Sequence, residues 1–182
     1  MIFKIISRAL SILKLEKNTY KEITQDKSSF IYSSTIIFLA TLINVYLFGK
    51  YVNPMLPIKI PLMSIFLVWL LFNWCLFSFV LNIVANLFAK KKNKKNFLTS
   101  INLVGFSYTP ELLKILIILL PNFIKVISWG ALMLVLASQV IGVKETYKIE
   151  KLFISIGTVF LSYILQIFII VSFVVIFTRL SV

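Results

Sequence analysis

Residues 61–89 read "PLMSIFLVWLLFNWCLFSFVLNIVANLFA" and contain no charged side chain. About 20 apolar residues are enough for a helix to cross the roughly 30 Å hydrocarbon core of a membrane. The run lacks the period-2 alternation of membrane-barrel strands, and only helices and closed barrels satisfy their backbone hydrogen bonds in lipid. The stretch therefore predicts a transmembrane helix.

The rest of the chain has the same character. Of its 182 residues, 60% are hydrophobic and the mean hydropathy is +1.00, whereas a soluble domain is about 45–50% apolar. We expect an all-α integral membrane bundle of five transmembrane helices in residues 30–182, preceded by amphipathic and short polar helices in residues 1–29. The other four apolar runs are residues 30–48, 97–120, 123–143 and 152–177.

The distribution of basic residues predicts the orientation. Fourteen of the 19 Lys and Arg residues fall before the first span and in the second and fourth connections, and only four fall on the other side. By the positive-inside rule the N-terminus is cytoplasmic and the C-terminus is outside. Basic residues beside spanning helices favour anionic lipid headgroups, and no nucleic-acid partner is expected. The residues predicted to contact headgroups are Lys4, Arg8, Lys14, Lys90, Lys91, Lys92, Lys94 and Lys95.

An amphipathic helix is expected at the start of the chain. In "MIFKIISRALSILKL", residues 1–15, basic and small polar residues share one helical face, and apolar residues, mostly isoleucine and leucine, share the other. This helix either lies on the cytoplasmic leaflet or packs on the protein's own loops. Thr19 and Glu22 then predict a capping box for a short polar helix.

The third apolar run, residues 97–120, contains a proline and two charges. Thr109 is expected to cap a new helix that begins at Pro110, with Glu111 in its first turn. The segment is therefore predicted to be broken at Pro110. If its two pieces stay in line, the break lies about 20 Å from the cytoplasmic end.

Glu111 and Lys114 have two interpretations. In the structural one, residues 97–108 lie tilted along the interface, and Glu111 pairs with Lys114 in the headgroup zone. In the functional one, both side chains face the bundle interior and bind or pass an ion, since intramembrane charges and broken helices mark transport sites. The structural interpretation is favoured, because a carboxylate beside its own counter-ion is typical of a neutralised pair.

Enzymatic chemistry has few candidates in this sequence. The chain has no histidine, one cysteine and six acidic residues, and it lacks H-E-x-x-H, G-x-S-x-G and glycine-rich phosphate motifs. No second carboxylate lies near Glu111 to form an acid–base pair. We therefore expect no catalytic residues, no metal site and no cofactor.

Three stretches resemble the Yip-one domain family, named for Ypt/Rab-interacting protein, in its bacterial form. Residues 8–49 match the family's start, where a basic helix precedes a Tyr-x-Glu-Ile-x-x-Asp element, here Tyr20 to Asp26. The stretch "LVGFSYTPELLKIL", residues 103–116, is similar to the family's Gly-Phe-x-x-x-Pro-x-Leu-Leu segment, and residues 129–149 are similar to its Trp-led fourth helix. The resemblance implies five crossings and a cytoplasmic N-terminus.

The resemblance has limits. Eukaryotic relatives carry an Asp-Leu-Tyr-Gly-Pro-like region associated with Rab GTPases, and nothing similar precedes Phe30 here, so Rab binding is not carried over. The richness in Ile, Lys, Asn and Phe indicates an AT-rich genome and a bacterial cytoplasmic (inner) membrane. We expect a non-enzymatic protein that organises membrane or scaffolds a partner, either another membrane protein or a second copy, through its basic cytoplasmic face. The alternative is a small transporter or channel that uses the broken third segment around Glu111 and Lys114.

Overall fold

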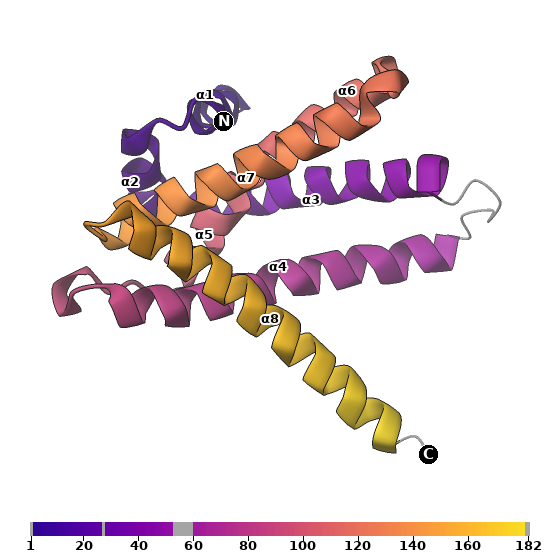
Figure 1. The fold of residues 1–182 in the computed structure, drawn as a ribbon. Helices are drawn as coiled ribbons and strands as arrows, with labels where there is room; N and C mark the ends of the chain where they lie inside the picture. Colours follow the sequence, from indigo (N-terminus) through magenta and orange to yellow (C-terminus); the bar gives the residue numbers. More distant parts are fainter. Residues whose placement is uncertain (1, 27, 53–59, 181–182) are drawn as a thin grey trace.

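The computed structural model describes residues 2–26, 28–52 and 60–180, and in these ranges the chain forms helices and no strands (Figure 1). The α-helices are α1 (Ile2–Leu13), α2 (Lys17–Gln25), α3 (Ser29–Leu47), α4 (Ile60–Phe88), α5 (Phe97–Ser107), α6 (Leu116–Leu119), α7 (Ile124–Tyr147) and α8 (Leu152–Leu180). A π-helical turn, η1 (Phe48–Val52), ends α3, and three 3₁₀ segments are η2 (Lys91–Asn93), η3 (Thr109–Ile115) and η4 (Pro121–Phe123).

Five helical segments within the described residues are long and apolar enough to cross a membrane. They confirm the prediction of an all-α bundle with five spans, and their limits lie within a few residues of the predicted runs. The third segment is made of α5, η3 and α6 in succession. The segments are Ser29–Tyr51, Ser64–Phe88, Phe97–Leu119, Pro121–Tyr147 and Leu152–Ile176.

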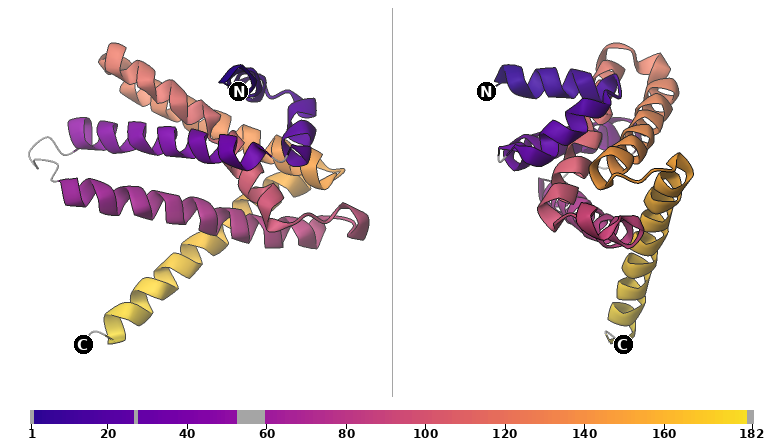
Figure 2. Two further views of the ribbon diagram at one scale, coloured as in Figure 1. Left: turned by 180° about the vertical axis from the view of Figure 1, so that it is seen from behind. Right: turned by 90° about the vertical axis from the view of Figure 1, so that its left-hand side faces the viewer.

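The molecule has two distinct ends. Figure 1 shows α2, η2 and the turn between α7 and α8 together at one end, which we call the basic end. The α6–α7 hairpin, the end of α3 and the start of α4 lie at the other, which we call the opposite end. The third segment therefore runs from one end to the other. Figure 2 shows α1 lying across the bundle direction near the basic end, and α8 diverging from the other helices toward its C-terminal end.

Helix α5 lies in the middle of the bundle. Every residue from Ser100 to Ser107 is buried, and α5 packs against α3, α4 and α7. Gly105 permits the close approach of α3, because a Cβ atom added there would lie 2.5 Å from the Ser33 Cβ atom. The Ser33 hydroxyl donates a hydrogen bond of 3.2 Å to Asn102 Oδ1 across the same contact. This piece therefore packs inside the bundle, and its tilt along the membrane interface stays a prediction.

Helix α1 packs on the protein itself. Ile12 is fully buried in a cluster with Tyr20, Tyr32 and Phe106. Other side chains of α1, including Leu10, remain exposed, so one side of the helix is free to meet lipid or water. Of the two interpretations of this helix, the contacts described here support packing on the protein.

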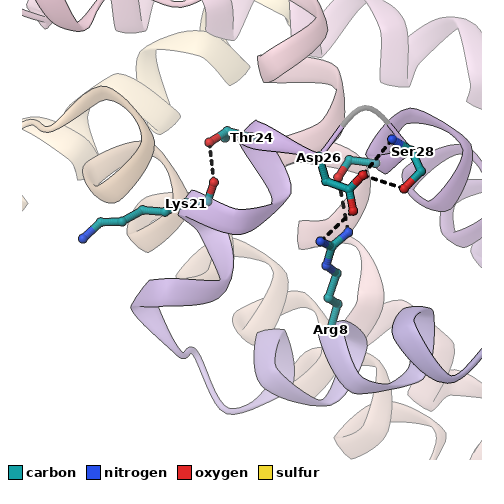
Figure 3. A network of polar contacts seen from close by, with 6 residues as sticks. Arg8, Lys21, Thr24, Asp26 and Ser28 are labelled. Atoms are coloured by element: carbon teal, nitrogen blue, oxygen red, sulfur yellow. Dashed lines mark hydrogen bonds and ion pairs between the residues drawn. The ribbon is translucent and has the colours of Figure 1, made fainter.

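Arg8 is the anchor of that packing (Figure 3). Its guanidinium forms an ion pair of 2.8 Å with Asp26 and lies 5.9 Å from the centre of the Tyr32 ring. Asp26 also accepts hydrogen bonds from the backbone N–H and the hydroxyl of Ser28. Because Arg8 is only 6% exposed, the prediction that it contacts lipid headgroups is corrected.

Helix α2 is locked onto α7 by one tyrosine. The hydroxyls of Tyr20 and Ser138 lie 2.8 Å apart in a hydrogen bond, and burial raises the pKa of Tyr20 to about 12. A Cβ atom added at Gly142 would lie 2.9 Å from the Tyr20 ring, so only glycine admits this contact. The capping box is wrong: α2 begins at Lys17, and its N-cap, Glu16, makes no side-chain capping bond.

Candidate functional site

The third segment breaks where proline removes a backbone donor. Pro110 has no N–H to give to the Phe106 carbonyl, and the Thr109 hydroxyl donates to that carbonyl instead, at 2.6 Å. The chain then continues as the 3₁₀ helix η3 before returning to an α-helical turn in α6. The break is thus at the predicted residues, but Thr109 does not cap the helix ahead of it. Its side chain satisfies the carbonyl freed behind it.

Glu111, Lys114 and Asn44 form a closed polar cluster. Glu111 Oε2 lies 2.5 Å from Lys114 Nζ and accepts a hydrogen bond of 2.9 Å from Asn44 Nδ2. Lys114 Nζ also donates to Asn44 Oδ1 at 3.0 Å. Each of the three side chains therefore binds the other two. The charges of the pair cancel, as the structural interpretation predicts, and Asn44 holds both partners.

The cluster is inside the bundle. The side chain of Glu111 is 8% exposed and that of Lys114 is 16% exposed. Asn44 follows Ser29, the first residue of α3, by 15 residues, which places it about 22 Å along that helix from the basic end. The pair is therefore inside the bundle, and its predicted place in the headgroup zone stays a prediction. The structure combines a neutralised pair with an interior location.

Two cavities meet at Asn44. The larger one has a volume of about 320 Å³ and lies between α3, α4, α6 and the start of α7, with Lys114 and Asn44 among its lining residues. The smaller one, of about 90 Å³, lies between α3, α4 and α8 and is also lined by Asn44. Leu70 lines both cavities as well. Asn44, which binds both charges, thus lines both spaces.

Polar side chains surround the smaller cavity. Gln166 on α8 donates to the backbone carbonyl and the side-chain oxygen of Asn73 on α4, at 3.1 and 3.2 Å. Trp74 also lines this cavity, and its buried Nε1–H has no hydrogen-bond partner among the described residues. A space of this volume and polarity is suited to hold water. A separate hydrogen bond of 3.0 Å, from the Tyr163 hydroxyl to Gln139 Oε1, joins α8 to α7.

The basic end presents its lysines outward. Lys14 on the α1–α2 connection is exposed, as are Lys91, Lys92 and Lys94 around η2, and Lys95 is partly exposed. Lys90 is exposed too, but it forms an ion pair with Glu150, and this contact lowers the pKa of the Glu150 carboxyl. The side chain of Lys4 lies outside the described part of the structure.

Asparagine side chains hold the lysine-rich connection in place. Asn86 Oδ1 accepts from the Lys95 backbone N–H, and Asn86 Nδ2 donates to the Lys95 carbonyl, both at 2.8 Å. Asn82 donates to Ser100 at 2.9 Å and to the Tyr147 hydroxyl at 3.1 Å, and thereby joins α4, α5 and α7. The connection is therefore fixed against the helices, and its lysines point out from a rigid base.

The sequence identified two members of the interior cluster, Glu111 and Lys114. The third member, Asn44, joins them from α3 through hydrogen bonds to both charged groups. These partners lie about 70 positions away in the sequence, so the only local indication of a role for Asn44 is that it is a polar residue within a span. Among the described residues, no group of three His, Cys, Asp or Glu side chains could hold a metal ion.

Two residues of the Yip-one-like element have structural roles here. Tyr20 binds Ser138 on α7, and Asp26 binds Arg8 on α1. Comparison of the chain with protein-family models, with curated proteins and with solved structures finds no match, so membership of the Yip-one family stays a prediction.

Proposed function

We propose that this chain is a non-enzymatic integral membrane protein of the Yip-one type that organises the membrane, or scaffolds a partner protein, through its basic end. The observation that carries the proposal is the outward display of lysines there. Lys91, Lys92 and Lys94 are exposed and have no carboxylate partner within the described residues. Each lysine near an anionic surface contributes about 1 kcal/mol of attraction.

The proposed orientation places this end in the cytoplasm of a bacterial cell, against the anionic inner leaflet. The rigid asparagine contacts around Lys95 support a surface that is presented in one shape. Such a surface favours a defined partner over diffuse attraction alone. The partner is another membrane protein or a second copy of the chain.

Purification in a mild detergent tests the scaffold. We expect a partner at fixed stoichiometry that is lost from the Lys91→Gln/Lys92→Gln/Lys94→Gln variant and kept by Lys125→Gln, which removes an exposed charge at the opposite end. A monodisperse chain without a partner, together with equal recovery from anionic and zwitterionic vesicles, would contradict the proposal.

A small transporter or channel is the second candidate. The observation that favours it is that Asn44, which binds the Glu111 carboxylate within the third span, lines two cavities. The purified chain in vesicles would then conduct protons or other ions, and the Glu111→Gln/Lys114→Met variant would not. Unchanged flux, growth and stability in that variant would remove the transport proposal and leave the scaffold.

A further inference from the structure

A cleft at the basic end brings together three lysines from two separate elements. It has a volume of about 250 Å³ and lies between α2 and the turn that joins α7 to α8. Lys21 comes from α2, Lys144 from the last turn of α7 and Lys148 from the residue that ends α7. None of the three has a carboxylate partner among the described residues.

Two carboxylates also line this cleft. Glu150 is already bound by Lys90, which belongs to the connection after α4. Glu145 forms no ion pair within the described ranges. The cleft therefore keeps a net positive charge, and a bound anion would meet three ammonium groups and one unpaired carboxylate.

The position of Lys21 is fixed by its neighbour. Tyr20 is held on α7 by its hydrogen bond to Ser138 and by its contact with Gly142. Figure 3 shows the side chain of Lys21 extending away from Arg8 and Asp26. The two walls of the cleft, α2 and the end of α7, are thus held together by the buried contact of Tyr20 with α7.

Lys148 occupies a backbone position that favours glycine. Its φ angle is 52°, in the left-handed region, and it ends α7 where the N–H groups of Lys148 and Ile149 both reach the Lys144 carbonyl. Glycine is the usual residue at such a position, because a side chain there raises the energy of the backbone. A lysine at this point places an ammonium group at the cleft in spite of that penalty.

The cleft lies at the level where two spans end. Tyr147 is the last residue of the fourth span and Leu152 the first of the fifth, so the turn between them sits at the membrane surface of the basic end. We propose that this cleft is a discrete binding site for the phosphate group of an anionic lipid headgroup. The proposal rests on the proposed function, in which the basic end meets headgroups, and assigns one defined site within it. Free phosphate has the same chemistry and is separated by the test.

The test measures binding of dioctanoyl phosphatidylglycerol to the full chain in an uncharged detergent, by native mass spectrometry. Dioctanoyl phosphatidylcholine and inorganic phosphate serve as comparison ligands. The cleft variant is Lys21→Gln/Lys144→Gln/Lys148→Gly. The matched control, with the same change in charge at exposed residues of the opposite end, is Lys50→Gln/Lys125→Gln/Arg179→Gln. Two single variants accompany them, Lys148→Gly and Glu145→Gln.

We expect one saturable phosphatidylglycerol site that the cleft variant weakens at least tenfold and the control by less than about twofold, since each nearby lysine contributes on the order of fivefold. Lys148→Gly should raise the melting temperature while weakening binding, which separates loss of the site from misfolding. Glu145→Gln should tighten binding.

Three results would overturn the inference. Equal weakening by the cleft variant and the control would show attraction by overall charge and remove the discrete site, while the proposed scaffold keeps its own copurification test. Binding of inorganic phosphate as tight as that of the lipid would assign the site to a soluble anion. No preference for phosphatidylglycerol over phosphatidylcholine in the unaltered chain would remove both the site and the headgroup contact on which it rests.

Discussion

The interior cluster predicts that one charge cannot be removed alone. In the Lys114→Met variant, Glu111 stays buried and keeps only Asn44 Nδ2, at 2.9 Å, of its two donors in the cluster. Leaving a buried charge without its partner costs about 3–5 kcal/mol of unfolding free energy. In the Glu111→Gln/Lys114→Met variant both charges are gone, and the loss reduces to interhelical hydrogen bonds worth about 0.6–1.7 kcal/mol each. The double variant should therefore be more stable than the single one.

Unfolding in mixed micelles, with the denaturing detergent titrated and tryptophan fluorescence followed, measures these differences. Asn44→Leu is the companion variant, because it removes one bond to each charge while leaving the pair itself intact; we expect a loss of about 1–3 kcal/mol. If Lys114→Met were as stable as the unaltered chain, or the double variant were less stable than Lys114→Met, the cluster would not be a buried, mutually neutralised unit.

Three further outcomes test the packing at the basic end. Gly142→Ala places a Cβ atom 2.9 Å from the Tyr20 ring and should lower the unfolding free energy by about 1–3 kcal/mol. The control, Gly130→Ala, has nothing within 4 Å of the added Cβ atom and should be neutral or slightly stabilising; equal effects of the two variants would contradict the contact between Gly142 and Tyr20. Because burial raises the pKa of Tyr20 from 10.0 to about 12, the unfolding free energy should be unchanged below pH 10 and fall by up to about 3 kcal/mol as the pH rises to 12. A Tyr20→Phe variant whose unfolding free energy falls equally steeply with pH would refute the assignment. Arg8→Gln and Asp26→Asn should each lower the unfolding free energy by about 1.5–3 kcal/mol and speed tryptic cleavage between α1 and α2. The double variant should be little less stable than either single variant, and additive losses would show that the two side chains act separately.

The spans could be predicted closely because their limits are set by solvent. Charged and polar residues stop each apolar run where the chain leaves the hydrocarbon, so residues 152–177, for instance, correspond to the span Leu152–Ile176. The break at Pro110 was predictable for a similarly local reason, because proline always removes one backbone donor.

The arrangement of the spans could not be predicted in the same way. Lipid and bundle interior are both apolar, so hydrophobic periodicity does not separate the buried face of a membrane helix from the exposed one. This is why the central place of α5 was missed. The place of Arg8 also depends on a contact that the sequence does not show. Its positive charge predicts contact with lipid headgroups, whereas its partner is Asp26, at the C-terminal end of α2.

The interior cluster could be predicted only in part, because it depends on contacts between residues that are far apart in the sequence. Glu111 and Lys114 lie three positions apart, and their pairing follows from helical spacing. Asn44 joins them from a different span, and the sequence gives only its polarity as a hint. The same holds for Gln166 and Asn73, whose bond connects α8 to α4.

Sidedness is the property on which the proposals depend most directly, and two single-cysteine variants measure it. In a Cys75→Ser background, Lys92→Cys places a thiol at an exposed position of the basic end, and Asn122→Cys places one at an exposed position of the α6–α7 hairpin. A membrane-impermeant maleimide applied to intact cells should label the Asn122→Cys variant alone, and the Lys92→Cys variant should react only after the membrane is opened. Labelling of Lys92→Cys in intact cells, or of both variants from the same side, would contradict five crossings with the basic end in the cytoplasm.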